Sequence, residues 1–372
     1  MKYIGFYTQY NTSIKRDCSM AAVDKMNYIL SSLPQEQYVD IFSCSAVMQG
    51  HSFYVKSDKC KINERTTLYF PPSFRVTNGF TKYLNSIWIS FCLFFYLIFK
   101  CTRKETIIVY HSTGYFFSII LAKYIKSLNL VLEVEEYYGN STKRLWYDRF
   151  FEDKNIKTAD SYLFASDTLS SIINKDNKPS IVIYGSYCVR PQISQKFNDG
   201  LTHVIYAGTF VPKKGGAKAS IQAAEFLNEM YHLHICGFGS EEEINTVKKG
   251  IEDTSKRCKT KITYEGLLQG DNYISFLQKC DIGLSTQNPV GSYNDTSFPS
   301  KIISYMANGL TVVSINIKAV STSKIGPFIS LYNNPEPREI ARAIMSVSKI
   351  TDPRDIISQL DYDFKQRIKG LL

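Results

Sequence analysis

Residues 298–313 read FPSKIISYMANGLTVV and place a short helix between a loop and a buried strand. Pro299 and Ser300 are typical of a helix start, which makes Ser300 a candidate N-cap. Gly309 is typical of a helix end, and the apolar run after it predicts a strand buried on both faces. Lys301 lies in the first turn, where a positive charge opposes the helix dipole unless an anion binds. The stretch therefore predicts a helix and strand of an α/β unit with an anion site.

The same alternation of strand and helix runs through the second half of the chain. Apolar runs that end in small residues predict strands, and the segments between them have helical patterns. The expected strands cover residues 203–210, 233–239, 261–267, 280–286 and 311–316. The expected helices cover residues 216–230, 240–249, 270–279, 301–308, 339–347 and 355–368.

The first half repeats this pattern. The expected strands cover residues 2–8, 38–44, 106–112, 129–138, 161–166 and 180–186, and the expected helices cover 19–32, 84–99 and 115–128. Residues 189–203 are polar and predict a connector. The chain is therefore expected to be α/β, with two doubly wound, Rossmann-like domains that face a cleft. In such sheets ligands bind beyond the carboxyl ends of the strands.

Length and composition agree with two folded domains. The 372 residues are 44% hydrophobic and 21% charged, which is ordinary for globular proteins. The net charge of +10 is concentrated in residues 1–190, which hold 23 Lys and Arg against 16 Asp and Glu. A basic surface can bind nucleic acid, anionic lipid or a phosphorylated substrate, and charge alone does not separate them. Nucleic acid is not expected, because the sequence has no helix-turn-helix, zinc module or concentrated basic stripe.

Cysteine use and the N-terminus indicate a cytoplasmic protein. The nine cysteines form no C-x-x-C pair and have no histidine spacing typical of zinc, so we expect reduced thiols and no bound metal. The first ten residues, MKYIGFYTQY, lack the apolar run of a signal peptide.

Residues 84–99, LNSIWISFCLFFYLIF, are almost wholly apolar and are followed by Lys100, Arg103 and Lys104. Sixteen residues are fewer than the roughly 20 that span a bilayer. Two interpretations are favoured: a buried core helix, and an interfacial helix that gives peripheral contact with the inner face of the plasma membrane. A membrane-spanning helix is the least favoured alternative.

Two turns with glycines follow expected strands in the second half. Gly208 and Thr209 precede Lys213 and Lys214, and backbone N–H groups with lysine charge favour a phosphate there, although a tight turn is the alternative. The second turn holds Gly237 and Gly239. It lacks the third glycine of G-x-G-x-x-G, because Glu242 stands there, so a mononucleotide loop and a structural turn both stay open.

The segments YAGTF, KKGG, HICGFGSEEEI, YEGLL, YISFLQKCDIGLST and FPSKIISYMANGLTVVS together resemble the donor domain of bacterial GT-B glycosyltransferases, especially glycosyltransferase family 4 and its polysaccharide-assembly relatives. The resemblance covers residues 203–316 well. The first half resembles these enzymes only in pattern, through VYHSTG, VLEVEEYYG, YLFAS and IVIYGS.

The resemblance implies an acceptor-binding domain over residues 1–190, a nucleotide-sugar donor domain over 200–348, and a C-terminal helix over 349–372 that packs back on the first domain. It implies that a nucleotide sugar, with a UDP-sugar expected, is the co-substrate and that no metal or other cofactor is obligatory. The implied donor-binding residues are Gly208, Thr209, Lys214, Gly237, Gly239, Leu267, Ser300, Lys301, Ile302 and Ser304.

The chain departs from the family pattern at two places. Thr296 and Ser304 stand where the family often has two glutamates, the second of which binds the donor ribose, and Thr209 stands where an arginine commonly follows the glycine. Donor identity and the anomeric outcome therefore stay open.

Three catalytic candidates come from the first half. His111 follows an expected strand where family members often carry a histidine that touches the donor sugar, and a structural histidine is the alternative. Glu135 and Glu136 follow the strand LVLEV. Either could act as a general base in an inverting reaction, and a solvated acidic pair is the alternative.

We therefore expect a glycosyltransferase that moves a sugar from a nucleotide diphosphate donor to a glycan or polyprenyl-diphosphate-linked acceptor in surface polysaccharide biosynthesis. The basic first half and the apolar helix motivate the lipid-linked acceptor. Two alternatives remain: a GT-B sugar-nucleotide epimerase, and a catalytically silent GT-B partner subunit that the missing glutamates would explain.

Overall fold

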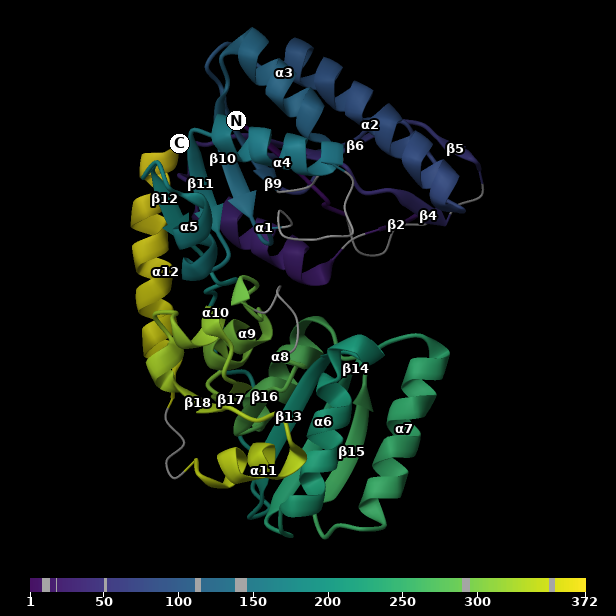
Figure 1. The fold of residues 1–372 in the computed structure, drawn as a ribbon, viewed down its shortest axis with the longest axis vertical. Coiled ribbons are helices and arrows are strands. Elements are labelled where there is room, and N and C mark those ends of the chain that lie inside the picture. Colours follow the sequence, from purple (N-terminus) through teal and green to yellow (C-terminus); the bar gives the residue numbers. More distant parts are fainter. Residues whose placement is uncertain are drawn as a thin grey trace. The chain divides into compact units, whose positions relative to one another are not determined.

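The computed structural model describes residues 1–8, 14–17, 19–49, 52–110, 115–137, 146–289, 295–347 and 352–372. The chain forms two compact units. Unit 1 consists of Met1–Ile183 and Phe364–Leu372, and unit 2 consists of Tyr184–Asp363. Each unit is built on a mainly parallel sheet with helices around it (Figure 1), as the sequence pattern predicts.

The unit 1 sheet has the strand order β12-β11-β10-β9-β1-β3-β7-β6. All neighbours are parallel except β6 and β7. The strands are β1 (Lys2–Gly5), β3 (Val39–Ser43), β6 (Asp58–Lys61), β7 (Thr66–Phe70), β9 (Thr106–Tyr110), β10 (Asn129–Val134), β11 (Ser161–Phe164) and β12 (Ser180–Val182). Two short antiparallel pairs, β2 (Lys15–Arg16) with β4 (Val47–Gln49) and β5 (Tyr54–Val55) with β8 (Ser73–Phe74), accompany the sheet.

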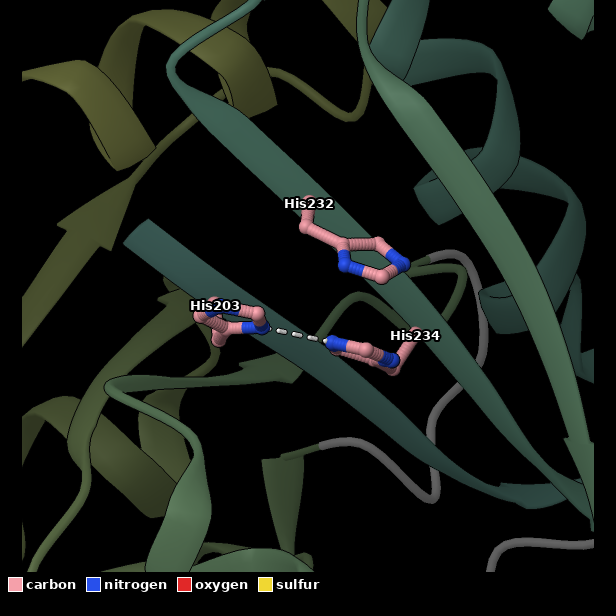
Figure 2. Close-up of side chains that lie close together, drawn as sticks. All are labelled: His203, His232 and His234. Atoms are coloured by element: carbon pink, nitrogen blue, oxygen red, sulfur yellow. Dashed lines mark hydrogen bonds between the residues drawn. The ribbon is translucent and has the colours of Figure 1, made fainter. Parts of the chain in front are cut away.

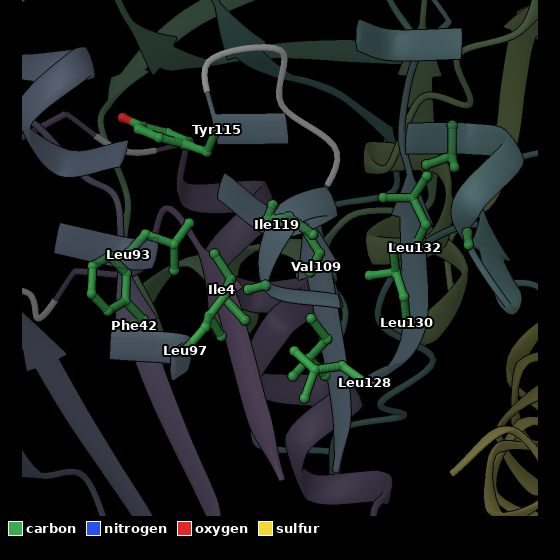
Figure 3. Close-up of a cluster of buried hydrophobic side chains, with 14 of the residues drawn as sticks. Ile4, Phe42, Leu93, Leu97, Val109, Tyr115, Ile119, Leu128, Leu130 and Leu132 are labelled. Carbon is green, nitrogen blue, oxygen red and sulfur yellow. The ribbon is translucent and has the colours of Figure 1, made fainter. Parts of the chain in front are cut away.

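One face of this sheet carries an apolar core (Figure 3). Alternate strand residues such as Ile4, Val109 and Leu132 meet Leu93 of α2 and Ile119 of α3 there. The unit 1 helices are α1 (Met20–Ser32), α2 (Gly79–Lys100), α3 (Phe116–Lys126), α4 (Trp146–Thr158) and α5 (Asp167–Ile173). Because consecutive residues of a strand point to opposite faces, the strands are apolar on both sides and need cover on both.

The end of the chain completes unit 1. The rings of Phe364 and Tyr28 lie 5.4 Å apart, and the Thr106 hydroxyl donates to the Leu372 carbonyl oxygen at 2.8 Å. The Arg367 guanidinium donates to the Ser180 carbonyl oxygen at 3.0 Å. Residues more than 180 positions apart in sequence therefore share one fold.

Helix α2 is longer and less buried than a core helix. It has 22 residues and begins at an Asn78 capping box, so the 16-residue length expected from the sequence was too short. Its buried residues Asn85, Ile89, Leu93 and Leu97 recur every fourth position and form a single narrow stripe. In the described part of the chain α2 is the one helix long and apolar enough to cross a membrane, with 22% of its apolar window buried.

The unit 2 sheet has the order β15-β14-β13-β16-β17-β18, and every pair is parallel. This is a doubly wound order in which the chain direction across the sheet reverses between β13 and β16. The strands are β13 (Thr202–Thr209), β14 (Tyr231–Phe238), β15 (Lys261–Gly266), β16 (Ile282–Ser285), β17 (Thr311–Ile315) and β18 (Ile329–Tyr332).

The unit 2 helices follow the expected order. They are η2 (Pro212–Lys214), α6 (Gly216–Ala223), η3 (Ala224–Phe226), α7 (Glu241–Ser255), α8 (Gly270–Lys279), α9 (Lys301–Ala307), α10 (Lys318–Ser321), η5 (Gly326–Phe328) and α11 (Pro337–Met345). Helix α12 (Arg354–Ile368) begins in unit 2 and continues from Phe364 into unit 1, where η6 (Lys369–Leu371) follows it. The helix expected over 216–230 is shorter, because it tightens into η3 after Ala223.

Strands β13 and β16 separate early. They pair only through Val204 and Ile205 of β13, and further along the Ala207 N–H donates to the hydroxyl of Tyr305 on α9 at 2.8 Å. Tyr305 is fully buried and lies against Gly283, where a Cβ would fall 2.4 Å from the ring. The Tyr305 hydroxyl thus accepts a hydrogen bond from a backbone N–H of β13 at a point where β16 no longer pairs with that strand.

The polar connector is fastened to unit 2. The buried Gln278 of α8 accepts from the Ile193 N–H at 2.8 Å, and its amide donates to the Pro191 carbonyl oxygen at 2.8 Å. Lys196 donates to the Cys280 carbonyl oxygen. Composition correctly predicted an irregular segment, but its backbone hydrogen bonds make it part of the unit 2 surface.

We expect Tyr305→Phe to lower the free energy of unfolding by about 1–3 kcal/mol, because the buried Ala207 N–H loses its acceptor. Tyr332→Phe is the matched control. Tyr332 is equally buried, and its hydroxyl has no hydrogen-bond partner in the described part of the chain. Chemical denaturation of both variants measures the difference, and equal losses would contradict a specific role for the Tyr305 hydroxyl.

Candidate functional site

The candidate site of unit 2 lies at the carboxyl edge of its sheet, where β13 and β16 diverge. Gly208 and Gly237 are register partners at the ends of β13 and β14. Gly237 has a φ of +152°, and a Cβ there would lie 1.8 Å from the Gly208 carbonyl oxygen. A Cβ on Gly208 would lie 2.9 Å from Nζ of Lys301. The ends of β13 and β14 therefore lie next to each other, and the Lys301 ammonium lies beside Gly208.

Lys301 begins α9 and is half-buried. Its Nζ lies 4.0 Å from the ring centroid of Tyr206, which is a cation–π distance. Within the described residues no carboxylate pairs with it. Burial, together with the positive charge of Lys214, lowers the pKa of Lys301 to about 7. A desolvated cation next to a second cation is an arrangement that a bound anion would stabilise.

The Lys214 loop is held in place by the loop after β16. The Asn288 N–H donates to the Lys214 carbonyl oxygen at 2.9 Å, and the Thr286 hydroxyl donates to the Gly216 carbonyl oxygen at 2.9 Å. Gly215 between them has a φ of +65°, which favours glycine. The two loops that border the switch point of this sheet are therefore joined by one backbone and one side-chain hydrogen bond.

The turn around Gly239 has a structural explanation. Ser240 and Glu243 form a capping box at the start of α7. A Cβ on Gly239 would lie 2.6 Å from the Glu243 carboxylate. Gly239 is thus required for the cap, while Gly237 is the glycine that faces Gly208.

The start of α9 differs from the prediction. Ser300 stands at the N-cap position, but its backbone is helical (φ −55°, ψ −24°) and its hydroxyl makes no capping hydrogen bond, so the N-cap prediction was wrong. The Ile302 N–H already donates to the Pro299 carbonyl oxygen at 3.0 Å, and the Ile302 side chain is fully buried. The Ser304 N–H donates to the Ser300 carbonyl oxygen. The group in this segment that could bind an anion is therefore the Lys301 ammonium.

Two further predicted residues lie at neighbouring strand ends. Thr209 is half-buried at the end of β13. Leu267 follows β15 after Gly266, which has a φ of +73°, and its side chain is 48% exposed. Leu267 is therefore free to contact a flat, apolar group at this edge of the sheet.

In unit 1, the partly buried Glu135 belongs to a polar network with a buried lysine. Lys25 of α1 forms ion pairs with Glu135 and, at 3.7 Å, with Glu133 of β10. The Tyr3 hydroxyl donates to Glu133 at 2.5 Å. Burial raises the pKa of Glu133 to about 7, with Lys25 opposing the rise. Glu136 is half-buried and has no ion pair in the described ranges.

The third catalytic candidate, His111, lies outside the described residues. Of the predicted site residues, the structure brings Gly208, Gly237, Lys214 and Lys301 together within unit 2. Glu135 and Glu136 lie at the end of β10 in unit 1.

A sequence model of the group 1 glycosyl transferases matches residues 162–349, just over half of the chain. This chain belongs to the group 1 glycosyl transferases. No curated protein matches it by sequence.

Solved structures share the fold of this glycosyltransferase over its whole length. OtsA in its apo form matches with a TM-score of 0.69 at 12% identity, covering 100% of this chain and 98% of that one. HepE of Anabaena in complex with UDP and glucose matches at 0.62 and 13% identity, covering 100% and 98%. The UDP-forming trehalose-phosphate synthase of Burkholderia xenovorans in complex with glucose-6-phosphate matches at 0.65 and 8% identity, covering 100% and 99%. The predicted GT-B fold of two Rossmann-like domains is confirmed.

Several residues that organise these candidate sites were missed from the sequence. Tyr206 and Tyr305 were part of quoted motifs but were not singled out, although Tyr305 lies one helical turn after Lys301 on the same side of α9. Lys25 and Glu133 were also missed, because each lies within a segment that was interpreted only as a helix or a strand. A charged residue inside such a segment is the sign that would have identified both.

We expect the buried Glu133 to make the glycosyltransferase less stable as pH rises. Between about pH 4.5 and pH 7 the native carboxyl keeps a proton that the unfolded chain has released, so stability falls across this window by about 3 kcal/mol. Glu133→Gln removes the charge and keeps an acceptor for Tyr3. Thermal midpoints measured at about pH 5 and about pH 8 should show a larger gain for the variant at the higher pH.

The exposed carboxylate variant Glu241→Gln is the control for general charge effects and should show no such trend. A gain for Glu133→Gln that is the same at both pH values would rule out a buried proton on Glu133.

Proposed function

We propose that this protein transfers a sugar from a UDP-sugar and that Lys301 binds the diphosphate of the donor. The observation that carries the proposal is the half-buried Lys301 ammonium, which lacks a carboxylate partner in the described residues and borders Gly208 at the switch point of the unit 2 sheet. Lys214 supplies a second positive charge from the neighbouring loop. Ligands of doubly wound sheets bind at this place.

The assignment of UDP draws on the relatives and on the strand ends. HepE binds UDP and glucose in a solved complex with the same fold. In this chain Leu267 and the Gly237–Gly239 turn, with Thr209, would contact the nucleoside, and Ser300 and Ser304 would border the donor from α9. The polar side chains Thr296 and Ser304 would leave the ribose without the carboxylate expected from the family.

The chemistry follows from the charges. When the bond between sugar and diphosphate breaks, negative charge develops on the leaving oxygen, and two lysines fixed beside it stabilise that charge without a metal. In unit 1, Lys25 already engages Glu135, so Glu136 is the better candidate for accepting a proton from an acceptor hydroxyl. His111 remains the proposed contact to the donor sugar.

Affinity for UDP-glucose is expected to fall as pH rises, because Lys301 must be protonated to bind and its pKa in the free protein is about 7. Above pH 7 the dissociation constant should increase toward about tenfold per pH unit. UDP-glucose is the probe because its diphosphate diester has no group that titrates near neutrality. Calorimetric titration at several pH values measures the effect.

Lys301→Arg is the matched control, since its charge persists and the affinity should be nearly independent of pH. Lys301→Ala should weaken binding by about tenfold or more, with no pH dependence. The same pH dependence in Lys301→Ala as in the wild type would refute the diphosphate assignment. Absence of binding to UDP, GDP or TDP sugars would favour the silent-partner alternative.

We propose further that the acceptor is a polyprenyl-diphosphate-linked glycan of surface polysaccharide biosynthesis and that unit 1 contacts the cytoplasmic face of the membrane. Helices α2 and α3 pack beside one another in unit 1 (Figure 1) and expose apolar side chains, the α2–α3 apolar face. Its members are Phe80, Tyr83, Leu84, Ile87, Trp88, Phe91, Phe95, Phe99, Phe117, Leu121, Tyr124 and Ile125.

The charges beside this face fit an anionic lipid surface. Lys100, Arg103 and Lys104 are exposed where α2 ends. Phe99 is 74% exposed immediately before them. Aromatic side chains next to lysine and arginine are suited to the interface of an anionic bilayer.

A Phe95→Glu and Phe99→Glu double variant should lose binding to vesicles by tenfold or more, since each buried phenylalanine contributes about 1.5–3 kcal/mol. Co-sedimentation with vesicles of equal phosphatidylethanolamine and phosphatidylglycerol measures it. The control carries glutamate at Met230 and Phe328, which are as exposed but belong to unit 2. Equal sedimentation of the double variant and the wild type would reject the lipid contact.

A further inference from the structure

Three histidines gather on one face of the unit 2 sheet (Figure 2). His203 on β13 is the register partner of His232 on β14, and His234 follows two residues later. Residues two apart on a strand point to the same face, so the three rings share one side of the sheet. Figure 2 shows the rings turned toward one another.

One nitrogen of each ring lies within 4.8 Å of the others. The nearest two are His203 Nδ1 and His234 Nε2, which are 2.9 Å apart. In a tetrahedral zinc site with bonds of about 2.0–2.1 Å, neighbouring ligand nitrogens are about 3.3 Å apart. A metal ion would therefore replace the hydrogen bond after a small separation of these two rings.

The outer nitrogen of each ring meets an oxygen. His203 Nε2 lies 2.9 Å from the Asp199 carboxylate, and His234 Nδ1 lies 2.8 Å from the Glu265 carboxylate. His232 Nε2 lies 3.1 Å from the Thr263 hydroxyl, which itself donates to Glu265 at 2.5 Å. Metal-binding histidines have this pattern, in which the far nitrogen donates to a carboxylate or hydroxyl and fixes the ring.

The cluster is shielded from solvent. The side chains of His203, His232 and His234 are 1%, 6% and 2% exposed. The Phe197 ring stacks on His203 with centroids 4.0 Å apart, and Phe276 meets His234 edge-on at 5.1 Å. Two carboxylates bordering a buried group of imidazoles create a negative surrounding that a cation would neutralise.

We propose that His203, His232 and His234 bind a divalent zinc ion, with a water molecule in the fourth position. Imidazole nitrogens suit zinc and related late transition metals better than magnesium or calcium. The ion would join β13 to β14 directly, and through Asp199 and Glu265 it would also fix the connector and β15. It would lie away from Lys301, because His203 stands near the start of β13 and Gly208 near its end, about 17 Å along the strand.

The test uses the full chain, stripped with a chelator and carrying Cys188→Ser, because Cys188 is an exposed thiol that could bind zinc by itself. Titration with zinc should give one ion per chain and raise the thermal midpoint. Cobalt in place of zinc should give the intense visible absorption of a tetrahedral site. His234→Gln should abolish both responses.

A second variant guards against loss of the fold. Asp199 is half-exposed, and Asp199→Asn should fold normally and weaken zinc binding about 10- to 100-fold. The exposed Glu252→Gln on α7 is its control and should bind as the wild type does. Zinc binding of equal affinity and stoichiometry in His234→Gln, or no shift of the midpoint in the stripped wild type, would overturn the proposal.

Discussion

The separation of β13 from β16 is the constraint on which the donor half of this protein depends. Neighbouring parallel strands normally keep exchanging backbone hydrogen bonds along their length. Here the pairing of β13 with β16 stops, and the Tyr305 hydroxyl accepts the Ala207 N–H instead. The same helix carries Lys301 one turn earlier, so one element both satisfies the open strand and delivers a cation to the opening. The close approach of Gly208 and Gly237 follows from this arrangement, because neither position has room for a side chain.

The two units treat buried lysines differently. In unit 1, Lys25 is compensated by Glu133 and Glu135, and the network stabilises the packing of α1 on the sheet. In unit 2, Lys301 has only the Tyr206 ring as a described neighbour of opposite electrostatic character, and Lys214 adds repulsion. A compensated lysine supports a fold, whereas an uncompensated one reduces stability and is retained where it has a ligand to bind.

The sequence predicted the fold, and it singled out residues that the structure places together, while the limits have physical causes. Strand and helix alternation fixed both sheets because buried parallel strands are continuous apolar runs. Lys301, Gly208 and Gly237 were found because charge and glycine at strand ends are visible locally. The predicted N-cap role of Ser300 was wrong, because its backbone is already helical and its hydroxyl makes no capping hydrogen bond. The histidine cluster was missed because its members come from two strands, although His-x-His on a strand places both rings on one face.

The contribution of Phe364–Leu372 to unit 1 has a consequence for biosynthesis. Unit 2 is one continuous segment, so all of it is synthesised before Phe364–Leu372. Unit 1 starts earlier in the chain but receives its contacts from Phe364 to Tyr28 and from Leu372 to Thr106 only after all of unit 2 has been made. The unit whose synthesis begins first is therefore the last to finish folding, because α1, β9 and β12 wait for these contacts until unit 2 has been made.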